Sequence, residues 1–136
     1  MIIALASQAS PSRKGARTIL VVEDDIFVRL MIAGELRERG FRVVEAASGD
    51  EAITLLNGSI AVDLVFTDVQ MPGHVDGVGL THFIREKRPE LKVIVTSGHP
   101  PTDFRESVDG FFAKPYAPVD VVGRISELLG LNIRPS

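Results

Sequence analysis

Four apolar runs of this sequence end in residues that could do chemistry together. The first run ends in three acids, a later one in a single aspartate, and two more end in a serine and a lysine. The residues concerned are Glu23, Asp24, Asp25, Asp68, Ser97 and Lys114. Carboxylates that converge on one point repel one another unless a cation lies between them, so these acids imply a hard divalent metal ion. A carboxylate can also accept a phosphoryl group, provided that the charge on the transferred oxygens is neutralised.

Magnesium fits such a cluster of acids. It usually takes one or two carboxylates and fills its other positions with water and phosphate oxygens, so we expect Asp24 and Asp68 to be direct ligands. Mn²⁺ and Ca²⁺ remain alternatives at the same ligands. Asp68 is then the candidate nucleophile toward a phosphoryl donor. Lys114 would supply a positive charge and Ser97 a hydrogen bond to a phosphoryl oxygen, so the chemistry would depend on positioning and electrostatics.

These residues can meet only if the apolar runs are parallel strands of one sheet. From Thr18 onward, short apolar runs alternate with amphipathic stretches, which is typical of parallel strands joined by crossover helices. In an open doubly wound sheet, the ligand site lies outside the carboxyl ends of the strands, where the strand order reverses. The candidate residues all follow predicted strand ends. The predicted strands are 18–22, 42–45, 63–67, 92–96 and 110–113.

Caps and breakers set the limits of the predicted helices. The first helix covers 26–39, the second follows the capping-box spacing of 48–51 and stops at 57–58, and the third covers 77–87. The last helix begins near Pro118 and ends at Gly130. In the first helix, one apolar stripe of the kind that packs on a core consists of Phe27, Leu30, Met31 and Gly34. The inward residues of the last helix are predicted to be Val119, Val122, Leu128 and Leu129.

The bulk composition is typical of one globular domain. The chain has 136 residues, of which 45% are hydrophobic and 24% charged. A net charge of −3 without a long Lys/Arg run predicts no nucleic-acid partner. The apolar stretch 1–6 is too short to cross a bilayer and cysteines are absent, so we expect a cytoplasmic protein with no membrane partner. We expect a flexible N-terminal tail over 1–17, the domain over 18–131 and a C-terminal tail over 132–136.

Four sequence segments carry a family resemblance. They are TILVVEDD at 18–25, DLVFTDVQMPG at 63–73, VIVTSGH at 93–99 and FFAKPY at 111–116. In this order they resemble the receiver domains of two-component response regulators, in the stand-alone, chemotaxis-regulator-like form. The resemblance implies an α/β, flavodoxin-like, doubly wound sheet of five parallel strands in the order 2-1-3-4-5. It also implies phosphorylation by a histidine kinase or a histidine phosphotransfer protein, and no enzymatic activity beyond the domain's own phosphorylation and dephosphorylation.

The resemblance assigns a role to each matching position around the metal. Asp68 matches the phosphoacceptor. Asp24 matches the direct metal ligand, and Glu23 the acid that acts through water. Gln70 matches the position whose backbone carbonyl completes the metal shell, while Asp25 falls one place beyond the acidic pair.

Further positions match the residues that respond to phosphorylation. Ser97 matches the switch hydroxyl and Phe111 the switch aromatic. Lys114 matches the lysine of the family, and the resemblance implies a cis bond between Lys114 and Pro115. Gln70 and His99 fall where the family tunes the lifetime of the phosphorylated state, although for His99 an uninvolved loop residue is an equal alternative.

The chain departs from the family pattern in two loops. The stretch between Ser97 and Lys114 is about five residues shorter, roughly one and a half turns of helix, so the fourth helix should be shortened or irregular. Pro100 and Pro101 leave only about 102–108 for it. The loop 71–79 is one residue longer than usual and carries His74, which we expect to be a solvated loop residue; His82 is expected on a helix surface.

We therefore predict a single-domain response regulator that signals through phosphorylation-dependent binding of an unidentified downstream protein or through a phosphorelay. One alternative is a phosphorylation-independent binding module with a receiver fold, which the shortened fourth helix favours. The other is a metal-dependent aspartyl-phosphate phosphatase. Such enzymes carry an additional acid two residues after the nucleophile, and that position is Gln70 here.

Overall fold

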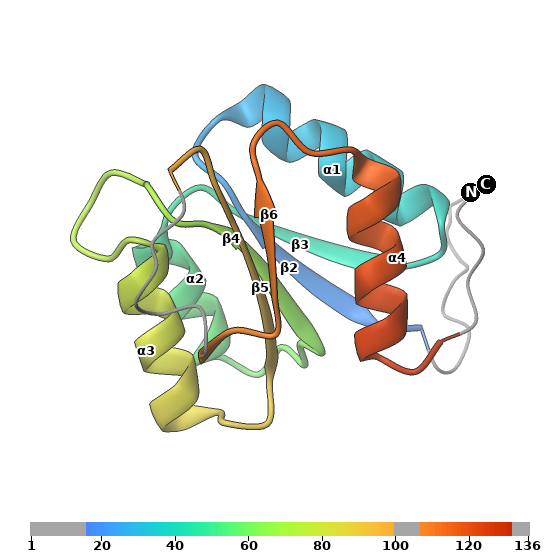
Figure 1. Cartoon of the computed structure of the whole chain (residues 1–136). Helices are drawn as coiled ribbons and strands as arrows, with labels where there is room; N and C mark the ends of the chain where they lie inside the picture. The colour runs from blue at the N-terminus through green and yellow to red at the C-terminus, as the bar shows by residue number, and fades with distance from the viewer. Residues whose placement is uncertain (1–15, 100–106, 132–136) are drawn as a thin grey trace, which may run out of the picture.

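A single five-stranded parallel sheet forms the centre of the molecule (Figure 1). The computed structural model describes residues 16–99 and 107–131. The strands are β2 (Thr18–Val22), β3 (Arg42–Ala46), β4 (Leu64–Asp68), β5 (Lys92–Ser97) and β6 (Gly110–Ala113). They lie side by side in the order β3-β2-β4-β5-β6, which is 2-1-3-4-5 when the strands are numbered along the chain. The predicted flavodoxin-like strand order is therefore confirmed.

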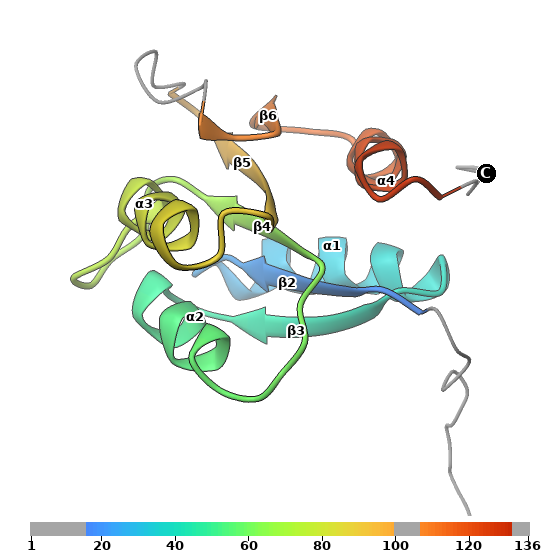
Figure 2. The ribbon, with the colours of Figure 1, turned by 90° about the horizontal axis from the view of Figure 1, so that it is seen from below.

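Helices cover both faces of the sheet (Figure 2). One face packs against α1 (Ile26–Glu38) and α4 (Pro118–Leu128), and the other against α2 (Gly49–Leu56) and α3 (Gly77–Lys87). Each face has its own hydrophobic core. All residues of β2 and β4 are buried because both strands lie between these two layers, and this explains their continuous apolar runs in the sequence.

Side-chain caps start three of the helices. Asp25 accepts hydrogen bonds from the backbone N–H groups of Phe27 and Val28 at the start of α1. Ser48 caps α2 by accepting from the N–H of Glu51, as the capping-box spacing predicted, and Asp76 caps α3. These bonds satisfy N–H groups that have no partner within the helix.

The predicted orientation of α1 is wrong. Phe27, Leu30 and Met31 face outward, and the side chain of Phe27 is 81% exposed. The residues that pack on the sheet are instead Ile32, Ala33 and Leu36. The helix is apolar on two sides, so the periodicity of its sequence did not determine which stripe would be buried.

The inward side of α4 is also only partly as predicted. Val122 is fully buried, but Val119 is exposed. Val121 and Ile125 form the centre of the packed surface instead. Leu128 and Leu129 are half-buried against the same core.

Several expectations fall outside the described residues. These are most of the shortened fourth helix at 102–108, the flexibility of the two tails, and the apolar stretch 1–6. Within the described part of the chain, none of the helices combines the length and the apolar character that crossing a membrane requires.

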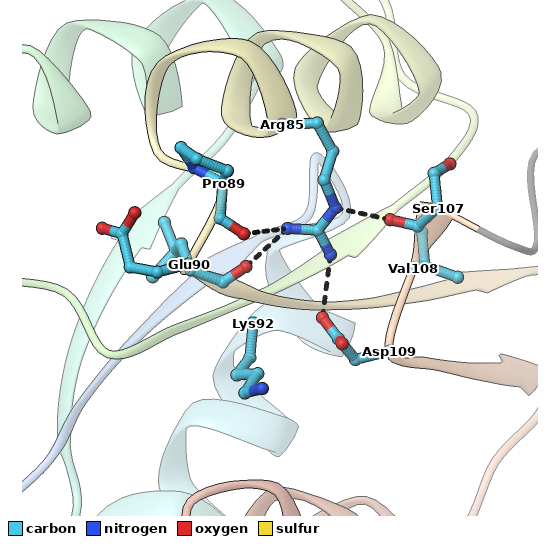
Figure 3. A pocket seen from close by; sticks show the side chains of 8 residues that line it. Arg85, Pro89, Glu90, Lys92, Ser107, Val108 and Asp109 are labelled. Atoms are coloured by element: carbon cyan, nitrogen blue, oxygen red, sulfur yellow. Dashed lines mark hydrogen bonds and ion pairs between the residues drawn. The ribbon is translucent and has the colours of Figure 1, made fainter.

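An arginine of α3 anchors the chain just before β6 (Figure 3). Arg85 donates to the backbone carbonyls of Ser107 and Leu91 at 2.7 Å each. It also pairs with the carboxylate of Asp109 at 2.8 Å, and the same Asp109 oxygen accepts from the N–H of Val93 at 2.8 Å. Arg85 therefore joins α3, the start of β5 and the segment that leads into β6.

Candidate functional site

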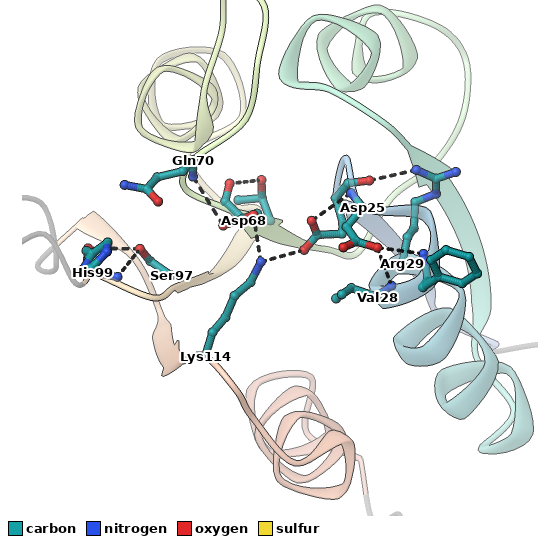
Figure 4. A network of polar contacts seen from close by, with 11 residues as sticks. Asp25, Val28, Arg29, Asp68, Gln70, Ser97, His99 and Lys114 are labelled. Atoms are coloured by element: carbon teal, nitrogen blue, oxygen red, sulfur yellow. Dashed lines mark hydrogen bonds and ion pairs between the residues drawn. The ribbon is translucent and has the colours of Figure 1, made fainter.

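The carboxyl ends of the central strands bring the predicted site residues together (Figure 4). Asp68 is the last residue of β4, and Glu23 and Asp24 directly follow β2, its hydrogen-bonded neighbour. Ser97 ends β5 on the other side of β4, and Lys114 directly follows β6. Since parallel strands end at the same edge of a sheet, residues far apart in the sequence meet at this edge.

Three carboxylates form the centre of the site. One oxygen from each of Glu23, Asp24 and Asp68 can be chosen so that all three lie within 4.8 Å of one another. Glu23 and Asp68 are 3% and 6% exposed, whereas Asp24 is open to solvent. Two like charges 4 Å apart repel by about 4 kcal/mol at the effective dielectric of a protein surface. This set of oxygen atoms fits a hard divalent cation such as Mg²⁺, which would remove the repulsion.

Lys114 supplies a positive charge to the same cluster. Its Nζ lies 2.9 Å from Asp68 Oδ2 and 3.1 Å from Glu23 Oε1. Burial works to lower the pKa of Lys114, but its hydrogen bonds to the two carboxylates outweigh that effect and raise the pKa above the ordinary value of 10.5. Lys114 therefore stays charged at neutral pH and offsets part of the negative charge of the acids.

The surroundings of Glu23 disfavour the charged form of its carboxylate. Burial raises its pKa above the ordinary value of 4.5, and the nearby charge of Asp68 raises it further. A hydrogen bond from the N–H of Asp25 and the contact with Lys114 act in the opposite direction without cancelling the effect. The site thus holds a carboxylate whose charged form a nearby cation would stabilise.

The loop after Asp68 is shaped by a glycine. A side chain at Gly77 would collide with the backbone carbonyl of Asp68, and the Gly77 N–H donates to the carbonyl of Val69 at 2.8 Å. The loop returns so closely that only glycine fits there. Gln70 lies within it, and its N–H donates to Asp68 Oδ1 at 3.3 Å.

The predicted switch residues lie near the site with their own partners. Ser97 is fully buried, and its hydroxyl donates to the carbonyl of His99 and accepts from the N–H of His99, both at 3.0 Å. Phe111 is half-buried against the α2–α3 core, on the opposite side of β6 from Phe112. The Lys114–Pro115 bond is cis, as the resemblance implied.

The other candidates lie outside the carboxylate cluster. Asp25 serves as the helix cap of α1. His74 is almost fully exposed in the loop before α3, with its Nδ1 3.7 Å from Asp50 Oδ2. His82 is exposed on α3, and His99 is exposed beside Ser97.

Two residues near the site escaped the sequence reasoning. Arg29 donates to the backbone carbonyl of Glu23 at 2.8 Å. The hydroxyl of Tyr116 is buried and has no hydrogen-bond partner among the described residues. Burial, followed by the charges of Glu23 and Asp68, raises the pKa of Tyr116. Tyr116 is the last residue of the FFAKPY segment, although the sequence pattern assigned it no role. The bond from Arg29 on α1 to the preceding strand end has no sequence pattern.

An apolar surface of α1 lies beside the site. Its exposed residues are Ile26, Phe27, Leu30 and Met31. It adjoins a hollow of about 370 Å³ whose lining consists of Val28, Met31, Lys114, Pro115 and Tyr116. We call these exposed residues and the hollow the α1 surface. Because Lys114 both lines the hollow and contacts Asp68, the α1 surface is continuous with the carboxylate cluster.

Known proteins share this sequence pattern. The response regulator receiver domain family matches residues 19–126. The sensor kinase CckA of Brucella abortus is 36% identical over 123 residues, which are 85% of this chain and 13% of that protein. The transcriptional regulatory protein ResD of Bacillus subtilis is 34% identical over 116 residues, which are 82% of this chain and 47% of that protein. The chain thus spans less than half the length of either relative.

Solved structures share the fold. The response regulator protein TrrA of Thermotoga maritima, determined in complex with Mg²⁺ and BeF, has 27% sequence identity and a TM-score of 0.71. The match covers 82% of this chain and 98% of that one. Together with the strand order and the cluster of acids, the family match shows that this chain belongs to the response regulator receiver domains of two-component systems.

Proposed function

We propose that this chain accepts a phosphoryl group on Asp68 from a histidine kinase or a histidine phosphotransfer protein. The observation that carries the proposal is the contact of Lys114 Nζ with Asp68 Oδ2 at 2.9 Å, directly beside the two acids Glu23 and Asp24. Receiver domains are in general signalling modules, and this arrangement provides a nucleophile, Asp68, together with a positive charge from Lys114.

The reaction would transfer the phosphoryl group between two side chains. A carboxylate oxygen of Asp68 forms a bond to phosphorus while the bond from phosphorus to the donor histidine nitrogen breaks, and that nitrogen keeps the electron pair. The ammonium group of Lys114 would stabilise the charge on the transferred oxygens. The N–H of Gln70, which donates to Asp68 Oδ1 at 3.3 Å, is placed to hold the nucleophile in position.

A divalent cation would complete the site. We propose Asp24 and Asp68 as direct ligands, the backbone carbonyl of Gln70 as a third, and Glu23 as a ligand through water. Mg²⁺ is the expected ion and Mn²⁺ an alternative. When bound, the ion supplies positive charge that balances the phosphoryl oxygens. The complex of the similar protein TrrA with Mg²⁺ and BeF supports this choice.

The α1 surface favours a protein as the phosphoryl donor. Exposed apolar side chains lose contact with water when a partner covers them, and Phe27 and Leu30 offer such contacts on the helix whose Met31 shares a hollow with Lys114. A small phosphodonor would need no such surface. We propose that the helix bearing the donor histidine packs there.

The output would follow from a change in the loop after β5. We propose that a phosphoryl group on Asp68 draws the Ser97 hydroxyl away from its present bonds to His99, and that Phe111 responds. The result would be altered binding of a downstream protein or onward transfer of the phosphoryl group. We propose that the domain acts in this way in the cytoplasm.

Intact mass spectrometry after incubation with acetyl phosphate tests the central step. We expect one phosphoryl adduct on the wild type in the presence of Mg²⁺, little without it, and none on Asp68→Asn. Folded wild type without any adduct would contradict the proposal and favour a binding module that does not use phosphorylation. Continuous release of inorganic phosphate from a small phosphate ester would favour a phosphatase.

A further inference from the structure

Arg29 connects α1 to the strand end that carries the acidic pair. Its Nη1 donates to the backbone carbonyl of Glu23 at 2.8 Å (Figure 4). Its Nε donates to Glu45 Oε1 of β3 at 3.0 Å. Its side chain is only 15% exposed. A single guanidinium near the start of α1 thus bonds to the residue that follows β2 and to a side chain of β3.

The other polar groups of Glu23 are also bonded. Its N–H donates to the carbonyl of Ala46 at 3.0 Å. Its carboxylate accepts from the N–H of Asp25 and from Lys114 Nζ, both at 3.1 Å. Arg29 therefore completes the bonding of this residue by donating to its carbonyl, for which the part of the chain that the structure describes provides no other donor.

This carbonyl belongs to the peptide group that joins Glu23 to Asp24. Since a peptide group is planar, a bond that holds its oxygen also fixes the orientation of the group and the direction of the Cα atoms on either side. The bond from Arg29 thereby restricts how the Asp24 carboxylate is presented beside Asp68. Groups that orient metal ligands in this way contribute strongly to metal affinity.

We propose that Arg29 is a positioning residue for divalent-cation binding at Glu23, Asp24 and Asp68. The inference rests on the metal site of the proposed function. The positive charge of Arg29 by itself repels a cation, so the two effects of removing it have opposite signs. Loss of positioning weakens cation binding, whereas loss of charge alone strengthens it.

Arg37 provides a matched control in the same helix. It pairs with the other oxygen of the same Glu45 carboxylate, Oε2, at 3.0 Å. It donates to the carbonyl of Val43 rather than to Glu23, and its side chain is 47% exposed. Replacing Arg37 therefore removes a positive charge and a Glu45 contact without touching the peptide group before Asp24.

Calorimetric titration of the unphosphorylated chain with Mg²⁺ tests the proposal. We expect Arg29→Ala to raise the Mg²⁺ Kd roughly tenfold, and Arg37→Ala to change it by less than about twofold. Arg29→Gln is also neutral but keeps an N–H donor, so we expect it to bind Mg²⁺ more tightly than Arg29→Ala. A charge effect alone would make these two variants equal.

Equal or tighter Mg²⁺ binding by Arg29→Ala would overturn the proposal. Thermal melts and circular dichroism establish that each variant is folded, and if Arg29→Ala is not, the comparison of Arg29→Gln with the wild type decides by the same criterion. Absence of Mg²⁺ binding in the folded wild type would instead contradict the metal site of the proposed function.

Discussion

Lys114 carries the positive charge of the carboxylate cluster, and its contacts make the stability of the molecule depend on pH. Its raised pKa means that the folded state holds the Lys114 proton more tightly than the unfolded chain does. The stabilisation from this proton is therefore fully present below the ordinary pKa of 10.5, and it is lost as the pH rises through the higher pKa of the folded state.

We predict that Lys114→Met lowers the free energy of unfolding in metal-free solution at neutral pH, because two buried acids lose their counter-charge. The difference from the wild type should persist up to about pH 10 and narrow above the ordinary pKa of 10.5. Urea unfolding at a series of pH values with a chelator measures it. Lys87→Met removes an exposed lysine of α3, and its difference from the wild type in the free energy of unfolding should not change over this pH range. A constant difference across this range would contradict the electrostatic role of Lys114.

At the scale of elements, α3 and β6 are connected through Arg85. The guanidinium binds the backbone carbonyls of Ser107, before β6, and of Leu91, before β5. Asp109 extends the connection to the N–H of Val93 at the start of β5. This network lies at the end of the sheet opposite the carboxylate cluster, where β5 and β6 begin. It anchors the chain where the shortened stretch between β5 and β6 returns to the sheet.

We predict that Arg85→Ala destabilises the fold by about 2 kcal/mol, since it leaves several carbonyl groups and one carboxylate without their charged donor. Arg88→Ala is the matched control, because the Arg88 side chain pairs at 3.5 Å with the exposed Glu90, and we expect a loss of about 0.5 kcal/mol or less. Chemical denaturation measures both. Hydrogen exchange at the N–H of Val93, which bonds to Asp109, should accelerate in Arg85→Ala. Equal stability of the two variants would show that the network contributes little.

At the scale of the whole molecule, the reactive edge of the sheet and the α1 surface form one continuous region. Phe27, the most exposed of the large apolar residues described, lies on this surface. A protein donor would cover it while its histidine reaches Asp68, whereas a small phosphodonor would reach Asp68 without contacting α1. Comparing the phosphorylation rates with the two kinds of donor therefore distinguishes an effect on docking to α1 from an effect on the reaction at Asp68.

We predict that Phe27→Ser slows phosphotransfer from a histidine phosphotransfer protein roughly tenfold, which corresponds to about 1.4 kcal/mol of lost contact energy. The rate with acetyl phosphate should not change. His82→Ser, an exposed substitution on α3, should affect neither rate. Time courses by intact mass measure both phosphotransfer rates for the wild type and for the two variants. An equal loss with both donors would mean that Phe27 supports the site itself, and no loss would remove α1 from the docking surface.

The sequence by itself determined the order of the elements and the edge of the sheet at which the acids meet. Apolar runs predicted strands β2 and β4 because both are buried on two faces, and caps at Ser48 and Gly130 predicted helix ends because they act within one turn. The positions of Asp24, Asp68 and Lys114 at this edge followed from the parallel arrangement and from the family resemblance.

Only the tertiary structure decided which side of α1 is buried and which groups orient the acids. Both sides of that helix are apolar, so its orientation depends on contacts such as the bonds from Arg29 to Glu23 and Glu45. The bonds of Ser97 with the backbone of His99 and those of Arg85 across two strands are likewise absent from any local pattern. Periodicity and caps report interactions within a few residues, whereas these bonds form only after packing has brought distant backbone groups within reach.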